Sequence, residues 1–204
     1  MFFKELPNSS ILAIELLSQI PAIALRIYRS VELNQILSTT VAEVRQLLDC
    51  DRVAIYRFNR DWSGKIMVES VSSPAFSLLE RAGVNPGLSA DWISSYQQGQ
   101  VQPVADIFNS NLTPGQIEGL EALGVRANLV VPILQNDSLL HEETDYLCSD
   151  RPRRLWGLLM AHQCVAPRQW QRIEIAFLQQ LANHVATAIQ KAELVEFSRQ
   201  LTQS

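Results

Sequence analysis

The three cysteines are the residues of this sequence with the most reactive side chains. Cys50, Cys148 and Cys164 are far apart in the chain, and their spacing suits neither a disulfide framework nor a metal site. Cys50 ends an amphipathic segment and Cys164 follows an apolar one, so both are expected to fill space in a core. Cys148 lies in a charged segment, which places it on the surface. Such cysteine usage fits a reducing, cytoplasmic setting.

Other kinds of chemistry leave no trace in the sequence. There is no nucleophile–base pair, carboxylate pair or metal cluster at usable spacing, and no glycine-rich phosphate loop. The net charge of −4 comes with no basic patch for nucleic acid. The apolar stretches are too short to span a membrane, and residues 1–28 lack the features of a signal peptide. We therefore expect a cytoplasmic domain that is not an enzyme and binds neither nucleic acid nor a membrane.

The order of helical and extended patterns predicts the fold class. Residues 52–58 alternate Val53 and Ile55 with Arg52 and Tyr56, which is typical of a strand. Pro21 is expected to kink or restart the first helix. The sequence predicts an α+β fold, with helices on one face of a central antiparallel sheet and long helices at both termini. Helices are expected at 9–28, 30–50, 90–97, 113–124 and 170–201, and strands at 52–58, 65–71, 127–134 and 155–164. Residues 102–108 are expected to be a short extended segment.

The last helix is longer than one core requires. Its apolar residues recur at nearly coiled-coil spacing, and they are Leu178, Leu181, Val185, Ala188, Ala192 and Val195. This stripe can pack along the sheet of its own chain, or it can also pair with a second copy in a homodimer. We expect a possible dimerising helix at 1–30, a core domain at 31–194, and at 195–204 the start of a linker helix toward a downstream signalling domain.

Several long strings identify a family resemblance. The strings "DRVAIYRFN", "RANLVVPI" and "WGLLMAHQC" resemble the GAF domain of phytochromes, and most of all that of their cyanobacterial offshoot, the cyanobacteriochromes. The resemblance covers residues 31–194. It implies a GAF fold that binds a linear tetrapyrrole (bilin) such as phycocyanobilin or biliverdin. It also implies that light isomerises the pigment and that the change passes to an output domain such as a histidine kinase.

The resemblance identifies three positions at which the chromophore groups of the family are changed. The family attaches its pigment through a cysteine followed by a histidine, in a pattern like T-P-C-H; this chain has Gly115 and Gln116 there. Gly115 has no side chain to form a thioether, and Gln116 cannot take up a proton as a histidine does. An aspartate that holds the pyrrole N–H groups is matched by Asn85, which keeps an acceptor oxygen but loses the charge.

One pocket residue of the family is retained. His162, in "AHQC", stands where the family has its second pocket histidine. On the resemblance it is a bilin-contacting residue; on the pattern alone it can also be a half-buried strand residue.

An insert of roughly sixteen residues, about 138–154, separates the last two strands. It contains Cys148. Some cyanobacteriochromes place an extra cysteine at about this location, where it attacks the central bridge carbon of the bilin. Cys148 is therefore a bilin-linking thiol, a redox or intermolecular thiol, or an incidental loop residue.

Two function hypotheses follow. The first is a sensory or regulatory GAF domain that does not bind bilin at the usual site and relays a signal through its terminal helices. The alternative is a photoreceptor that binds a linear tetrapyrrole without a covalent bond or through Cys148. A cyclic-nucleotide-binding GAF domain has less support, because only Arg81 and Arg126 are basic near the pocket loops.

Overall fold

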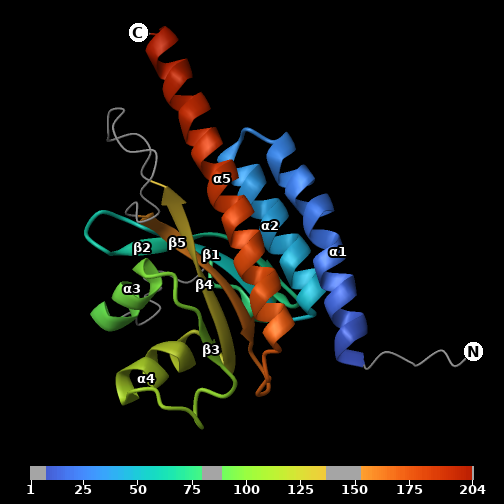
Figure 1. Ribbon diagram of the computed structural model, residues 1–204. Helices are drawn as coiled ribbons and strands as arrows, with labels where there is room; N and C mark the ends of the chain where they lie inside the picture. Colours follow the sequence, from blue (N-terminus) through green and yellow to red (C-terminus); the bar gives the residue numbers. More distant parts are fainter. Residues whose placement is uncertain (1–7, 80–88, 137–152, 204) are drawn as a thin grey trace, which may run out of the picture.

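The computed structural model describes residues 8–79, 89–136 and 153–203 (Figure 1). Its elements, in chain order, are α1 (Asn8–Arg29), α2 (Leu33–Leu48), β1 (Arg52–Phe58), β2 (Gly64–Val71), the short 3₁₀ helix η1 (Pro74–Phe76), α3 (Ala90–Gln97), β3 (Gln102–Val104), α4 (Pro114–Ala122), β4 (Ala127–Asn136), β5 (Arg153–Gln163) and α5 (Arg172–Gln203). Asn85, Cys148 and nearly all of the insert lie outside the described residues.

The strands form one antiparallel sheet in the order β2-β1-β5-β4-β3. β5 lies at its centre and pairs with β1 on one side and with β4 on the other. The α+β class and the antiparallel sheet expected from the sequence are confirmed.

The three long helices α1, α2 and α5 cover one face of the sheet (Figure 1). Apolar side chains of these helices meet those of the strands in a continuous core, which includes Leu37, Val44, Val131, Leu159 and Val185. This core is the larger of the two in the domain, and it holds the terminal helices against the sheet.

The two short helices α3 and α4 cover the opposite face (Figure 1). Their core includes Tyr56, Trp92, Leu120, Leu158 and Met160. The central strands are thus buried on both faces. For this reason Arg52 and Tyr56, which alternate with Val53 and Ile55, are not exposed but lie buried on the α3–α4 face.

Helix α1 contains Pro21. Of the two expected effects of this proline, a kink or a restart, the restart does not occur, because α1 runs as one helix from Asn8 to Arg29. Ile20, Ile23 and Ile27 are buried on either side of the proline and hold the helix against its neighbours.

α5 has 32 residues, and helical rise makes it about 48 Å long. Its buried positions end at Ala192, and its C-terminal turns extend past the sheet (Figure 1). Among the described residues, no helix combines the length and the apolar character needed to cross a bilayer.

Candidate functional site

A row of polar residues crosses three strands on the α3–α4 face. Arg52 of β1 is the register partner of His162 of β5, which in turn is the partner of Asn128 of β4. All three side chains are buried, and the exposed fractions of Arg52 and His162 are 1% each. Buried polar groups in the middle of an apolar sheet are costly unless they are paired, so the partners of this row decide what it can do.

Arg52 is held by three hydrogen bonds that it donates. Its Nε donates to Nδ1 of His162 at 3.0 Å, one terminal nitrogen donates to the carbonyl of Phe76 at 2.6 Å, and the other donates to the carbonyl of Leu123 at 2.9 Å. The guanidinium therefore connects the sheet to η1 and to the end of α4. Such a fork of donors in fixed directions is what only arginine provides.

The bond from Arg52 determines the protonation of His162. An arginine Nε–H is always a donor, so Nδ1 of His162 must accept, and the neutral ring carries its proton on Nε2. Burial, and in addition the charge of Arg52, lowers the pKa of His162 well below its ordinary value. At neutral pH the imidazole is an uncharged hydrogen-bond donor that cannot easily take up a second proton.

Two further polar atoms near His162 lack partners. Among the described residues, the hydroxyl of Tyr96 and Oδ1 of Asn128 are buried without a hydrogen bond. Burial raises the pKa of Tyr96, so its hydroxyl stays protonated. Both residues line, with His162, a small enclosed cavity of about 10 Å³. This is about the space of a single water molecule, and its polar walls suit one.

Helix α4 forms one wall of this cavity and carries Gly115 and Gln116 in its first turn. Leu120 and Leu123, at the other end of the helix, line the cavity. Thr113 caps α4: its Oγ1 accepts from the Gln116 N–H at 3.4 Å, and its own N–H donates to Oε1 of Gln116 at 2.9 Å. The Gln116 side chain thus forms a capping box. A side-chain Cβ at Gly115 would meet no atom within 4 Å from the rest of the described chain, apart from the backbone of its own helix and its chain neighbours.

The structure places the described site candidates on one side of the sheet but gives them different roles. His162 is in the cavity, Gly115 is in open space and Gln116 caps a helix. Cys50 is in the core as expected, where burial raises its pKa to about 12 and keeps it a thiol. Cys164 is half-buried.

Sequence reasoning missed Arg52, Tyr96 and Asn128 as site residues. Arg52 could have been predicted as a site residue. It begins the apolar string "RVAIYRF", and a charged residue on a buried strand needs a hydrogen-bonding partner. Nothing in the pattern marks Tyr96 or Asn128, since their importance comes from the lack of a partner in the folded chain.

The arrangement offers groups that can bind a ligand. They are a neutral donor on His162 and, among the described residues, two polar atoms without a partner in a small enclosure. Within the described ranges, no three His, Cys, Asp or Glu side chains are placed to hold a metal ion.

Comparisons with known proteins agree on the family. Residues 32–189 match the GAF domain family. The Synechocystis protein sll0041, named as a methyl-accepting chemotaxis protein, is 33% identical over 173 residues, which cover 85% of this chain and 16% of that protein. The circadian input-output histidine kinase CikA of Synechococcus elongatus is 32% identical over 198 residues, covering 88% of this chain and 24% of the kinase. The chain thus spans less than a quarter of the length of these relatives.

Solved structures give the same answer. The GAF domain of the cyanobacteriochrome TePixJ superposes with a TM-score of 0.65 at 34% identity, covering 82% of this chain and 95% of that one. The far-red-absorbing dark state of JSC1_58120g3, which contains bound biliverdin IXα, superposes with a TM-score of 0.68 at 30% identity, covering 89% and 99%. The chain therefore belongs to the GAF domain family, as a sensory domain of the kind found in cyanobacteriochromes and CikA-like signalling proteins.

Proposed function

We propose that this domain is a cytoplasmic sensory module that relays its signal through the terminal helices and does not attach a bilin at the usual position. One observation carries the proposal: Gly115, which on the resemblance replaces the attaching cysteine of the family, has no side chain with which to form a thioether. Gln116, which replaces the adjacent histidine, is used to cap α4.

The size of the cavity supports the same conclusion. Pockets for small ligands usually measure about 300–1,000 Å³. The enclosure beside His162 measures about 10 Å³, because Trp92, Tyr96 and Leu120 pack directly against the sheet. A linear tetrapyrrole needs far more space than this enclosure, so we infer that binding one beside His162 would require α3 and α4 to move away from the sheet.

A second candidate function is a photoreceptor with an unusual mode of bilin binding. The unpaired Tyr96 hydroxyl and Asn128 Oδ1, with the Nε2–H of His162, are the donors and acceptors that a ligand with pyrrole N–H and carbonyl groups needs. Such a pigment would be held without a covalent bond, or through Cys148 of the insert. The biliverdin in the JSC1_58120g3 structure makes this the alternative to test first.

The terminal helices support the relay. α5 packs on the sheet along its first two-thirds, and α1 is tied to it by the hydrogen bond between the Tyr28 hydroxyl and Nδ1 of His184 at 2.9 Å. Apolar side chains remain exposed along both helices: Leu17 and Leu25 on α1, and Leu194, Phe197 and Leu201 on α5. We propose that two copies of the chain form a homodimer through these exposed side chains, which belong to residues 1–30 and to the C-terminal end of α5. We also propose that residues 195–204 lead to a downstream signalling domain.

The decisive experiment is coexpression with bilin-synthesis enzymes. The purified domain would be examined by visible absorption, and then by zinc-enhanced fluorescence after denaturation in acid urea, with biliverdin and phycocyanobilin in turn. We expect a colourless protein. A band that survives denaturation and vanishes in Cys148→Ala would contradict the proposal and establish an insert-linked photoreceptor; a band lost on denaturation would establish non-covalent pigment.

A gain-of-function pair sharpens this result. Gly115→Cys with Gln116→His restores the two groups of the family, and the open space around Gly115 accepts the new side chain. The matched control is Gly115→Ser with Gln116→His, which has the same size but no thiol. If only the missing groups prevent attachment, the cysteine variant gains a covalent band and the serine variant does not. If both stay colourless, the packing of α3 and α4 excludes the pigment.

The dimer has a test of its own. Phe197→Glu puts a charge into the exposed stripe of α5, whereas Val165→Glu puts the same charge on an equally exposed turn residue outside it. Light scattering after size exclusion should show a dimer for the parent and for Val165→Glu, and a monomer for Phe197→Glu. Equal masses for all three would remove the stripe as an interface.

A further inference from the structure

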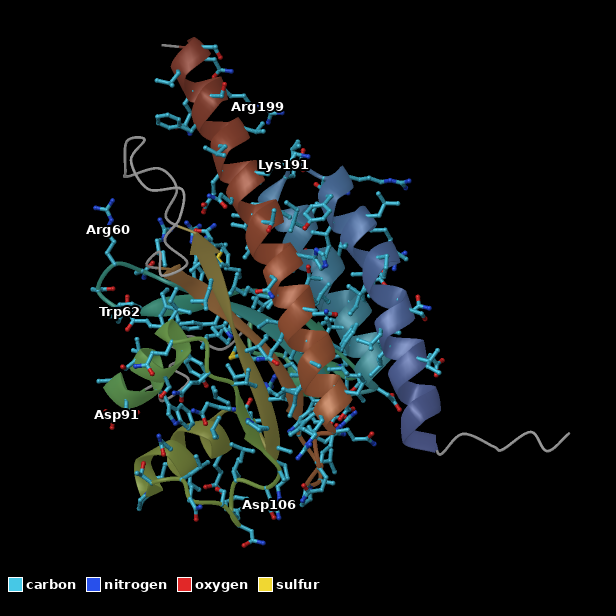
Figure 2. All side chains as sticks on the ribbon, in the orientation of Figure 1. Arg60, Trp62, Asp91, Asp106, Lys191 and Arg199 are labelled. Carbon is cyan, nitrogen blue, oxygen red and sulfur yellow. The ribbon has the colours of Figure 1, made fainter. Side chains whose placement is uncertain are left out.

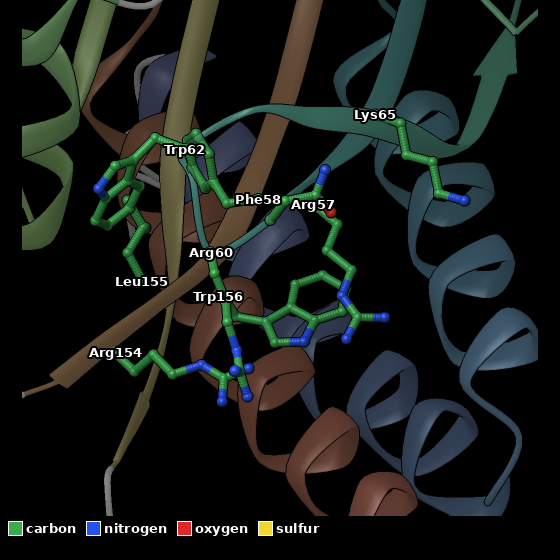
Figure 3. A pocket seen from close by; sticks show the side chains of 9 residues that line it. Arg57, Phe58, Arg60, Trp62, Lys65, Arg154, Leu155 and Trp156 are labelled. Atoms are coloured by element: carbon green, nitrogen blue, oxygen red, sulfur yellow. The ribbon is translucent and has the colours of Figure 1, made fainter.

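A basic groove lies at the end of the sheet opposite the polar row. It is formed by the end of β1, the β1–β2 turn and the start of β5, and its volume is about 640 Å³. Figure 3 shows Arg57, Arg60, Lys65 and Arg154 around it, together with the rings of Trp62 and Trp156. Arg57 is five residues along β1 from Arg52, or about 17 Å, so the groove is separate from the cavity at His162.

The positive charge of the groove is largely uncompensated. In the part of the chain that the structure describes, the ion pairs are Arg26–Glu43, Arg57–Glu193, Arg126–Asp106 and Arg168–Glu174, so Arg60, Lys65 and Arg154 take part in none. Arg60 and Arg154, from different strand ends, extend toward the same part of the groove (Figure 3).

Besides Glu193, which pairs with Arg57, a carboxylate of the β1–β2 turn lies beside these cations. Asp61, beside Arg60 in the turn, accepts hydrogen bonds from the N–H and the hydroxyl of Ser63, and these lower its pKa and keep it anionic. These bonds occupy one oxygen of Asp61, whose charge offsets part of that of Arg60. Among the described residues, Arg60, Lys65 and Arg154 still form no ion pair.

The same turn presents an aromatic ring. Trp62 has φ of +64°, a left-handed conformation that is unfavourable for a bulky residue by about 1 kcal/mol or more. The bonds from Asn59 N–H to the Ser63 carbonyl (2.7 Å) and from Trp62 N–H to the Asn59 carbonyl (3.2 Å) hold it there. The indole rests edge-on against Phe58, with ring centres 5.6 Å apart, and stays 43% exposed. Strain that displays an apolar ring beside cations points to a ligand.

We propose that this groove binds a nucleoside polyphosphate, with its phosphates between Arg60 and Arg154 and its base against Trp62. Guanidinium groups pair with phosphate oxygens in bidentate fashion, and an exposed indole is a stacking surface for a planar base. The groove has the volume of an ordinary small-molecule site. Figure 2 shows Arg60 and Trp62 together at the tip of the β1–β2 hairpin, away from Asp91 and Asp106.

The groove is connected to α5 by Arg57. Arg57 lies over the ring of Trp156, 5.1 Å from its centre, and its terminal nitrogen is 3.7 Å from Oε1 of Glu193 on α5. The same carboxylate oxygen accepts from Trp156 Nε1 at 3.0 Å. A bound phosphate competes with Glu193 for Arg57, and so loosens a contact at the point where α5 leaves the core.

The proposal is tested by isothermal titration calorimetry on the full chain with two probes, ATP and inorganic tripolyphosphate, at fixed salt. Arg60→Gln with Arg154→Gln should weaken both probes about tenfold or more. Trp62→Leu should weaken ATP about tenfold and leave tripolyphosphate unchanged. Glu193→Gln should tighten both by about twofold, since the pair it removes is half exposed.

The control is Arg172→Gln, which removes an exposed cation at the start of α5. It should leave both affinities unchanged. An equal loss in Arg172→Gln and in the groove variants would show that the probes respond only to net charge. No binding of ATP to the parent chain would overturn the proposal, and so would Trp62→Leu weakening the two probes equally. Arg60, Trp62, Arg154 and Arg172 are exposed and Glu193 is partly buried, so the variants should fold, which circular dichroism would verify.

Discussion

The two faces of the sheet are built from neighbouring residues of the same strands, yet they differ in kind. On the face that carries α1, α2 and α5, β5 contributes Leu159 and Ala161 to an apolar core. On the face that carries α3 and α4, the intervening positions contribute Leu158, Met160 and His162, and beside them lie the unpaired atoms of Tyr96 and Asn128. One face is packed for stability, and the other retains polar groups that cost stability.

This difference indicates where the domain can change. A core of apolar side chains at full density gains nothing from moving. The layer of α3 and α4 is different, because polar atoms beneath it have no hydrogen-bond partner among the described residues. A ligand or a rearrangement that supplied these hydrogen bonds would lower the free energy of the domain. In the proposed function, the first face holds the helix that relays the signal and the second carries the sensing site.

The largest effect should come from truncating the two leucines that lie back to back in β5. Leu159→Ala should lower the free energy of unfolding by about 4 kcal/mol, because the helical layer cannot close the space. Leu158→Ala should cost only about 2 kcal/mol, because α3 and α4 can settle toward the sheet. Urea denaturation measures both. Equal costs would mean that the faces are equally rigid.

Arg52 comes next. Arg52→Met keeps the bulk of the side chain but leaves two carbonyls and Nδ1 of His162 without their donor, so unfolding should become easier by about 3 kcal/mol. The matched control is Arg60→Met in the exposed turn, which should change stability by no more than about 0.5 kcal/mol. Similar values for the two arginines would show that the buried row is not a structural tie.

The pH dependence of stability should carry the signature of His162. The pKa of this imidazole is lowered in the folded chain, so its contribution is present above the ordinary value of about 6.5 and is lost as pH falls. Below pH 6.5 the free energy of unfolding should drop by up to about 1.4 kcal/mol per pH unit, until the folded pKa is reached. His162→Gln should remove this slope between pH 5 and 6.5, while His184→Gln should leave it in place.

The smallest effect distinguishes two tyrosines. Tyr28→Phe deletes a hydroxyl bonded to His184 and should cost about 1 kcal/mol. Tyr96→Phe deletes a buried hydroxyl without a partner, and should be neutral or stabilising by about 1 kcal/mol. A loss from Tyr96→Phe equal to that from Tyr28→Phe would show that this hydroxyl is satisfied, as by a water in the cavity.

Much of the fold follows from local patterns. The helix at 90–97 and the capped helix after Thr113 were predicted almost to the residue, because caps and glycines mark their ends. The two-sided burial of β1 was not, because a strand that alternates Arg52 and Tyr56 with Val53 and Ile55 has the same pattern whether its second face is wet or covered. The second face of β1 is covered by α3 and α4. These helices are so short that their sequence pattern does not show which surface they pack against.

The site was only partly predictable for a related reason. The chain resembles its family closely enough to locate His162, Gly115 and Gln116. Their roles as bilin-site residues, and those of Asn85 and Cys148, remain predictions. The polar row itself depends on strand register: Arg52, His162 and Asn128 are far apart in sequence and become neighbours only through the pairing of β1, β5 and β4.

The empty space around Gly115 has an evolutionary consequence. A glycine codon ending in a pyrimidine becomes a cysteine codon by one nucleotide change, and here the new side chain would disturb no neighbour. In the first turn of a helix it would even replace the poorest helix former after proline. If position 115 is the anchoring position, as the resemblance implies, the described neighbours do not dictate whether it holds a thiol. A lineage that carries this domain would then gain or lose the anchor by one substitution.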